Sequence, residues 1–392
     1  MRRTGHIRER SPGSFELRYS LGTDSATGKR KIATATVRGS RKNAAKELRR
    51  LLSAIDADDH VSPTRMTLRQ WLTTWLAAVR EEVAPGTHGF YAQIVDRFLL
   101  PALGNSSIAK LGPVQIQECY STLAEGGRRD GKPGGLSPQT RRHVHRVLSA
   151  ALSRAVEQQL IARNPCDAFR KRLVRVERRE MSVLSVEQST RLLAAIRSHR
   201  VYWPVLIALA TGARRGEILA LRWRNVDLDV STIRIERSLE HTKDGLRFKT
   251  PKSGKSRAVV LPNLAINELR RLKREKAEEL LQQGVRLDAD TLLCAKADGS
   301  AMLPTSLTHQ FAKVARKAKG VPRVRFHDLR HSHATQLLSV GIHPKVAQER
   351  LGHSSISITI DLYSHASETM QAEAAQRLDE LWQKNGTIEP GR

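Results

Sequence analysis

The spacing of apolar residues changes along this chain, and this change limits the folds that it can adopt. From residue 5 to about 37, apolar and polar residues alternate, as in Phe15-Glu16-Leu17-Arg18-Tyr19. From residue 67 to about 172, apolar residues instead recur at helical spacing. Alternation is typical of half-buried strands, and the helical period is typical of amphipathic helices. We therefore expect a mostly α protein with small β elements.

Polar stretches at Asp56–Pro63 and after Asn164-Pro165 divide the sequence into three predicted domains. Residues 1–60 are predicted to form a three-stranded sheet plus one helix. Residues 67–172 are predicted to be helical, and residues 183–385 to be mainly helical with short strands. A chain of 392 residues is too long for one ordinary core, which agrees with this division.

Individual elements can be placed within these domains. Strands are predicted at His6–Arg10, Phe15–Tyr19, Lys31–Val37, Ile233–Glu236 and Ala258–Pro262. Helices are predicted from Ser40 to about Ile55, from Ser137-Pro138 onward, at Val186–Ile196, at Trp203–Ala210, and from about Asn263 to the end. The helix that begins at Ser137-Pro138 would carry its polar side on Arg141, Arg142, His143, His145 and Arg146.

The chain is strongly basic, with 67 Lys plus Arg against 39 Asp plus Glu and a net charge of +28. Such an excess destabilises a compact state and usually marks a polyanionic partner. A membrane is the weaker candidate, because the sequence has no apolar run long enough to span one and no amphipathic anchor at its start. Aromatic residues make up only 4%, so base stacking is not expected as the main binding mode. The basic segment Arg163–Arg179 could follow a phosphate backbone or be a solvated linker.

The start of the chain and its cysteines bear on the compartment. Met1–His6 lacks the apolar segment of a secretion signal. Cys119, Cys166 and Cys294 are far apart and outside any metal-binding spacing, which predicts buried thiols in a reducing cytosol.

Two motifs that could indicate a cofactor are rejected. Gly126–Pro133 superficially resembles a phosphate-binding P-loop, but Pro133 stands where a hydroxyl would hold Mg²⁺ and no buried strand precedes it. His327 and His331 are four residues apart and His333 follows, a spacing that could suggest a metal site, yet the intervening Arg330 would repel a cation. We therefore expect neither ATP nor metal chemistry, and no cofactor.

A third motif follows the predicted helix that ends at Ala210. In Thr211-Gly212-Ala213-Arg214, the glycine can end the helix and place Arg214 on a backbone corner. Glu217 lies three residues later, where it could fix the guanidinium by a charge-assisted bond. Taken alone, this pattern is more often a surface arginine beside a helix cap.

Tyr363 gives the motif a further meaning. It follows His353 by ten residues, and the cluster His327-Asp328-Leu329-Arg330-His331 lies upstream. A single Tyr is usually a packing residue with a polar tip. A Tyr preceded by such cations in a strongly basic chain suggests a nucleophile for a phosphodiester.

In this order, the motifs resemble those of the tyrosine recombinases, the phage integrase family. The resemblance rests on Thr-Gly-x-Arg at Arg214, Pro251-Lys252-Ser253, His-x-x-Arg-His at 327–331, Leu-Gly-His at 351–353, and Tyr363. It covers nearly the whole chain. Residues 183–385 are similar to the catalytic domain, 67–172 to the core-DNA-binding domain, and 1–60 more weakly to an arm-type DNA-binding domain.

The resemblance implies a role for each motif residue. Arg214 and Arg330 would clamp the phosphate, His327 and His353 would donate to it, and Tyr363 would carry the 3′-phosphate covalently. Lys252 would be the general acid, with Lys255 as second candidate because the turn holds both lysines. Glu217 and His331 would be supporting residues. Whether His331 touches phosphate or packs against the tyrosine helix stays open.

The resemblance also implies partners. These are double-stranded DNA at core and arm attachment sites, three further copies in a homotetramer, and possible excisionase and DNA-bending host proteins, all in the bacterial cytoplasm at the nucleoid. The predicted amphipathic helix over 367–385 could pack on its own domain or on a neighbouring subunit. Alternative functions are a type IB topoisomerase or a non-catalytic DNA-binding protein of the same fold.

Overall fold

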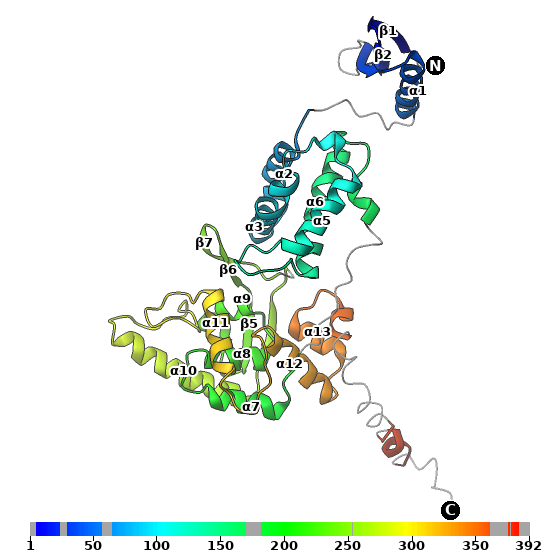
Figure 1. Cartoon of the computed structure of the whole chain (residues 1–392). Helices are drawn as coiled ribbons and strands as arrows, with labels where there is room; N and C mark the ends of the chain where they lie inside the picture. Colours follow the sequence, from blue (N-terminus) through cyan, green and yellow to red (C-terminus); the bar gives the residue numbers. More distant parts are fainter. Residues whose placement is uncertain are drawn as a thin grey trace, which may run out of the picture. The chain divides into compact units, whose positions relative to one another are not determined.

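The structure is a computed structural model that describes residues 5–23, 30–56, 65–169, 182–252, 254–360, 375–376 and 378–383. The chain forms two compact units, Met1–Glu177 and Arg178–Arg392, each described here by itself (Figure 1). Among the helices of these ranges, none combines the length and apolarity needed to cross a membrane.

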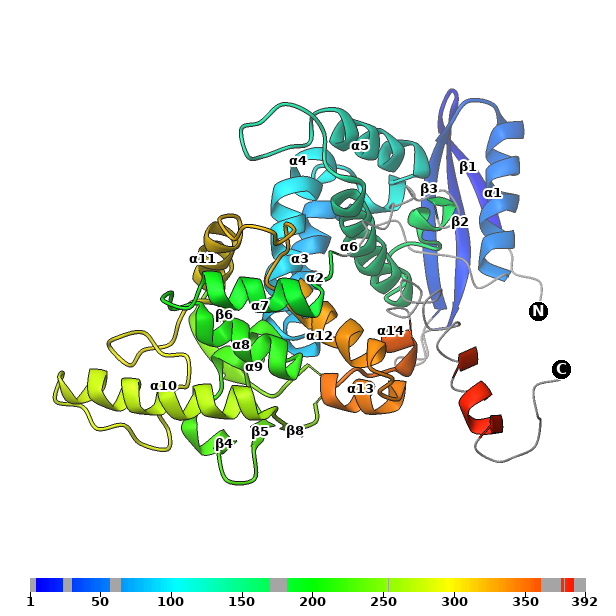
Figure 2. The same ribbon diagram turned by 90° about the horizontal axis from the view of Figure 1, so that it is seen from below.

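The N-terminal segment forms the predicted three-stranded sheet with one helix. Antiparallel strands β1 (Gly5–Ser11), β2 (Ser14–Thr23) and β3 (Arg30–Arg38) are joined in that order. Helix α1 (Arg41–Asp56) packs along the sheet (Figure 2). The small core comprises Phe15, Leu17, Tyr19, Ala44 and Leu48. Alternate residues of β2 supply three of these five core residues, as the period-two pattern predicts.

A helical bundle with its own core follows in the first unit. Its helices are α2 (Leu68–Glu82), α3 (Pro85–Ile94), a π-helical turn (Val95–Leu99), α4 (Leu100–Leu103), α5 (Pro113–Gly126) and α6 (Pro138–Glu157), with short 3₁₀ turns at Ile108–Lys110 and Pro165–Phe169. Thr67 and Gln70 form a capping box at the start of α2. Trp71 is buried and donates its indole N–H to the Ala151 carbonyl at 2.9 Å, which ties α2 to α6.

The second unit places helices around short strands. Its helices are α7 (Val186–Ala195), α8 (Tyr202–Thr211), α9 (Arg215–Leu219), α10 (Asn263–Leu281), α11 (Pro304–Ala315), α12 (Asp328–Ser339), α13 (Pro344–Leu351) and α14 (Ile356–Ile360), with a 3₁₀ turn at Trp223–Asn225. Strands β4 (Val226–Asp227), β5 (Thr232–Ile235) and β8 (Arg257–Val260) form one antiparallel sheet, and β6 (Ser238–Thr242) pairs with β7 (Gly245–Lys249). Helix α8 is apolar all round, and it contacts α7, α9 and α12. Its end is therefore held on several sides.

Several predicted details need correction. His145 was predicted on the polar side of its helix, but it is buried and its Nδ1 lies 2.9 Å from the Tyr120 hydroxyl. Its spacing of three and seven residues from Leu148 and Leu152 places it on the apolar stripe, and a partner from α5 satisfies the ring. Helices do not run without a break from Asn263, because residues 282–303 form turns and isolated bridges.

Other predictions have mixed outcomes. The three cysteines are buried and unpaired, as expected. Residues 170–179 of the basic segment Arg163–Arg179 and most of the predicted helix over 367–385 lie outside the described residues. Within that helix, residues 375–376 and 378–383 are helical, and Leu378, Leu381 and Trp382 are exposed.

Candidate active site

The corner after α8 is built on Gly212. This residue ends the helix in the left-handed region, at φ 65°, and its N–H donates to the Ala208 carbonyl at 2.8 Å. A Cβ at Gly212 would lie 2.5 Å from Leu351 Cδ2 and 2.6 Å from His333 Cδ2. Backbone conformation and lack of space therefore both require glycine, and the close approach brings α12 and α13 against the corner.

Arg214 and Glu217 are joined as the sequence suggests. The Arg214 backbone N–H and its Nη1 donate to the two carboxylate oxygens of Glu217, each at 2.9 Å. Glu217 is only 1% exposed. Oε2, the oxygen that accepts from the Arg214 backbone N–H, also accepts from Arg257 Nη2 at 2.7 Å. Burial alone would raise the pKa of the Glu217 carboxyl, but the Arg257 hydrogen bond and the charges of Arg257 and Arg214 lower it below its usual value.

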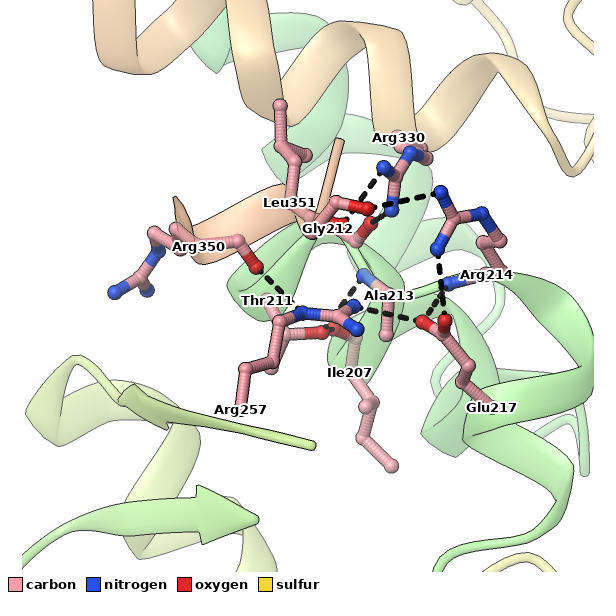
Figure 3. A network of polar contacts seen from close by, with 11 residues as sticks. Ile207, Thr211, Gly212, Ala213, Arg214, Glu217, Arg257, Arg330, Arg350 and Leu351 are labelled. Carbon is pink, nitrogen blue, oxygen red and sulfur yellow. Dashed lines mark hydrogen bonds and ion pairs between the residues drawn. The ribbon is translucent and has the colours of Figure 1, made fainter. Parts of the chain in front are cut away.

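Three arginines hold three successive carbonyls at the end of α13 (Figure 3). Arg257 Nε donates to Arg350 O at 2.9 Å, Arg330 Nη2 to Leu351 O at 2.7 Å, and Arg214 Nη2 to Gly352 O at 3.1 Å. A helix leaves its last carbonyls without intrahelical partners, so these bonds cap α13 with cations. They also fix the segment that leads into His353.

Arg330 is the most deeply buried of these cations, at 4% exposure. Its Nη1 donates to the Gly212 carbonyl at 2.6 Å, so one guanidinium spans the corner and α13. Burial, followed by the charge of Arg214, lowers the pKa of Arg330 to about 9. The group stays protonated near pH 7, and an anion placed beside it would restore a higher pKa.

The histidines around this cluster favour their neutral forms. His353 Nδ1 lies 2.9 Å from Thr359 Oγ1. Burial and the charges of Arg330 and Arg214 lower the pKa of His353 to about 4. The His327 and His331 rings meet edge to face, with centroids 5.1 Å apart. His327 is exposed, but neighbouring atoms still remove part of its hydration shell. This desolvation, followed by the charges of His331 and Arg330, lowers the pKa of His327 as well.

His331 is the more enclosed ring of this pair. Its Nδ1 is buried, and no hydrogen-bond partner meets it among the described residues. Loss of solvent, and after it the charge of Arg330, lowers the pKa of His331, although Asp328 opposes the shift. The structure therefore brings Arg214, Arg330, His331 and His353 to one place.

His333 on α12 and Arg350 on α13 both bond to backbone carbonyls at the end of α8. His333 Nδ1 lies 2.7 Å from the Leu209 carbonyl, and its Nε2 lies 3.2 Å from Arg350 Nε. A carbonyl only accepts and a guanidinium only donates, so His333 must be neutral with its proton on Nδ1. Arg350 Nη2 donates to the Ala210 carbonyl at 2.9 Å. The last turns of α8 and α13 are thus tied together through side chains.

The remaining predicted residues are Lys252, Lys255 and Tyr363. Lys252 is exposed on the turn between β7 and β8, where the Gly254 N–H donates to the Pro251 carbonyl at 2.9 Å. Lys255 is exposed on the same connection. Tyr363 lies outside the described residues. In the part of the chain that the structure describes, no group of three or more His, Cys, Asp or Glu is placed to hold a metal ion.

Sequence reasoning missed Arg257 and Arg350, and it considered His333 only as a metal ligand. Nothing in their spacing marks them, because their partners are backbone carbonyls and a glutamate brought close by folding. A weaker signal was available for Arg350, which directly precedes Leu351-Gly352-His353.

Comparison with known proteins gives the family. Residues 182–370 match the Phage integrase family, and residues 67–124 match the Phage integrase, N-terminal SAM-like domain. The chain belongs to the phage integrase family. The ICEBs1 integrase of Bacillus subtilis (strain 168) is 26% identical over 378 residues, which cover 96% of this chain and 99% of that protein. A "Tyrosine recombinase XerC-like" protein of Caldanaerobacter subterraneus subsp. tengcongensis is 28% identical, covering 81% of this chain and 84% of that protein.

Solved integrase structures share the fold. The Tn1549 transposon integrase in complex with transposon right end DNA aligns with a TM-score of 0.67 at 22% identity, over 80% of this chain and all of that one (100%). A lambda integrase dimer bound to a COC′ core site aligns with a TM-score of 0.60 at 18% identity, over 92% of this chain and 95% of that one. The mostly helical fold with small sheets, predicted above, is the fold of these integrases.

Proposed function

We propose that this protein is a site-specific DNA recombinase of the integrase type, which cuts and rejoins DNA through a 3′-phosphotyrosyl link at Tyr363. The observation that carries the proposal is the convergence of Arg214, Arg330 and His353. Both guanidiniums are fixed by hydrogen bonds to backbone carbonyls, and His353 follows directly after two of those carbonyls. Such fixed cations suit a phosphodiester, whose nonbridging oxygens gain charge as phosphorus becomes five-coordinate.

Arg214 and Arg330 clamp the scissile phosphate, because a planar guanidinium bonds two oxygens and stays charged. Neutral His353 and His327 each donate a ring N–H to the phosphate. A neutral His327 can also accept the phenol proton of Tyr363, which needs help because an ordinary phenol ionises only near pH 10. His331 supports His327, because its ring packs edge to face against the His327 ring.

The tyrosine oxygen bonds to phosphorus, and the bond from phosphorus to the 5′ oxygen breaks. Lys252 gives a proton to that leaving oxygen, and its exposed turn lets it reach DNA bound over the site. Lys255 is the second candidate for this role. A 5′-hydroxyl of another strand then reverses the attack. The phosphotyrosyl link stores the bond energy, so the reaction requires neither ATP nor a metal ion.

The partners in this proposal follow from the same chemistry. Four copies act on two DNA duplexes in the bacterial cytoplasm, residues 67–172 grip core-site DNA, and residues 1–60 bind arm-type sites. One solved relative is a lambda integrase tetramer bound to a Holliday junction, which supports a tetramer here. Excisionase and DNA-bending proteins would act as accessories. Relatives named integrase that match over nearly their whole length favour this function over a topoisomerase or a non-catalytic DNA-binding protein.

A suicide substrate tests the proposal. Candidate junction DNA with a nick beside the cleavage position releases a short product, so that the covalent adduct accumulates. The wild-type chain should give a protein–DNA adduct that survives denaturing electrophoresis, and Tyr363→Phe should bind the same DNA without forming it. An adduct formed equally by Tyr363→Phe would overturn the assignment of the nucleophile.

A further inference from the structure

Arg257 is the one arginine of the carbonyl-binding trio that the proposed chemistry does not use. It lies on β8, and its side chain is 9% exposed. Its Nε holds the Arg350 carbonyl at 2.9 Å, and its Nη2 holds Glu217 at 2.7 Å. A buried guanidinium is costly to desolvate, and simple packing on a strand would be met by an apolar side chain. We therefore look for the role of Arg257 in the two hydrogen bonds that its guanidinium donates.

These two bonds reach both halves of the site. Glu217 binds the backbone and side chain of Arg214, so Arg257 acts on that guanidinium through one carboxylate. The Arg350 carbonyl begins the series of three carbonyls that leads into His353. Figure 3 shows the Arg257 guanidinium between Arg350 and Glu217. One rigid group thus links the elements that carry Arg214 and His353.

The third nitrogen of Arg257 gives an independent observation. Nη1 is buried, and no hydrogen-bond partner meets it among the described residues. A Cβ at Gly352 would lie only 3.0 Å from this atom, so the guanidinium packs directly against the glycine before His353. An unpaired buried donor is unfavourable. The guanidinium is held in this position by the bonds of Nε and Nη2 and by its contact with Gly352, despite the unpaired Nη1.

We propose that Arg257 is a positioning residue of the strand-transfer site, which sets the distance between the Arg214 guanidinium and the His353 ring. It does not touch the phosphate. It aligns Arg214 through Glu217 and His353 through the Arg350 carbonyl and Gly352. Small errors in such geometry slow a reaction that depends on fixed cations, while binding of the rest of the DNA is unaffected. This inference rests on the proposed recombinase function.

Three variants separate positioning from folding. Arg257→Ala removes both bonds. Arg257→Lys keeps a cation near Glu217 but cannot hold the carbonyl and the carboxylate together in the planar geometry of a guanidinium. Arg234→Ala is the matched control, since Arg234 lies on the adjacent strand β5, opposite Ala258, and its side chain is 68% exposed.

The full-length variants are compared by single-turnover adduct formation on the suicide substrate, DNA affinity and thermal unfolding. Wild type must form the adduct first; if it does not, the recombinase function itself fails. Given that adduct, we expect Arg257→Ala to cleave on the order of 100-fold more slowly with DNA affinity within about three-fold of wild type. Arg257→Lys should cleave at an intermediate rate, and Arg234→Ala should match wild type.

If Arg257→Ala does not fold, Arg257→Lys carries the test. Cleavage by Arg257→Lys at the wild-type rate, or an equal loss of cleavage and DNA affinity, would overturn the positioning role.

Discussion

Replacing Glu217 by Ala should reveal how strongly the site depends on one buried carboxylate. Glu217 is 1% exposed and accepts three hydrogen bonds, from the Arg214 N–H, Arg214 Nη1 and Arg257 Nη2. Removal leaves Arg257, whose side chain is 9% exposed, with a buried uncompensated charge. Breaking a buried pair costs about 3–5 kcal/mol. The Arg214 side chain is 27% exposed, so water screens its share. We expect a total loss of about 4 kcal/mol in the free energy of unfolding, within the range for such pairs.

Urea unfolding of the full-length chain, followed by tryptophan fluorescence, measures this loss. Glu217→Gln keeps the shape and one acceptor but removes the charge, so it should lose about 2 kcal/mol. Glu278→Ala is the control, because Glu278 is exposed on α10 and its replacement should change stability by less than about 0.5 kcal/mol. If Glu217→Ala were as stable as Glu278→Ala, the reasoning that Glu217 compensates two arginines would be wrong.

Three further results are expected. Gly212→Ala should lower the free energy of unfolding by about 2–4 kcal/mol, because φ is 65° and the added Cβ meets Leu351 and His333. The control Gly284→Ala has a similar φ of 72° but open space around the Cβ, so it should lose only about 1 kcal/mol. Equal losses for the two variants in urea unfolding would contradict the packing argument. The pKa of His333 is near 6.5 in the unfolded chain and falls to about 4 in the folded chain. The free energy of unfolding should therefore fall by on the order of 3 kcal/mol as the pH drops from the higher value to the lower, and His333 should cause no change above pH 6.5. An unchanged pH dependence of stability in His333→Gln would refute this role of His333. Lys252→Ala should slow cleavage on the order of 100-fold or more with little loss of binding, and a 5′-thiolate leaving group should restore the rate; if Lys255→Ala shows this pattern instead, Lys255 is the acid.

The local elements of the fold were predictable where one pattern dominates. Alternation gave the three N-terminal strands, and the apolar run before Gly212 gave α8. The β6–β7 hairpin was missed, since only Leu239 of β6 is fully buried and the alternation is faint. Its Asp244-Gly245 pair was an available turn signal. The prediction that His145 lies on the polar side of its helix was wrong, because it followed the polar side chain and not the position of His145 on the apolar stripe.

The site could be anticipated in its motif residues but not in its supports. The bond between Arg214 and Glu217 follows from a spacing of three residues, which local structure fixes. Arg257, His333 and Arg350 act through carbonyls and side chains far away in the sequence, such as Glu217, 40 residues before Arg257. No single-sequence period contains such pairings, because they exist only once α8, α12, α13 and β8 have packed.

The identity of the DNA-linked residue tests the central claim most directly. Trypsin should release residues 351–377 as one peptide, and Tyr363 is its single tyrosine. Adduct from wild-type protein and the suicide substrate would be digested with nuclease and trypsin and sequenced by mass spectrometry. The proposed mechanism predicts a nucleotide joined through its 3′-phosphate to Tyr363. A nucleotide on any other residue, or a link through a 5′-phosphate, would contradict it.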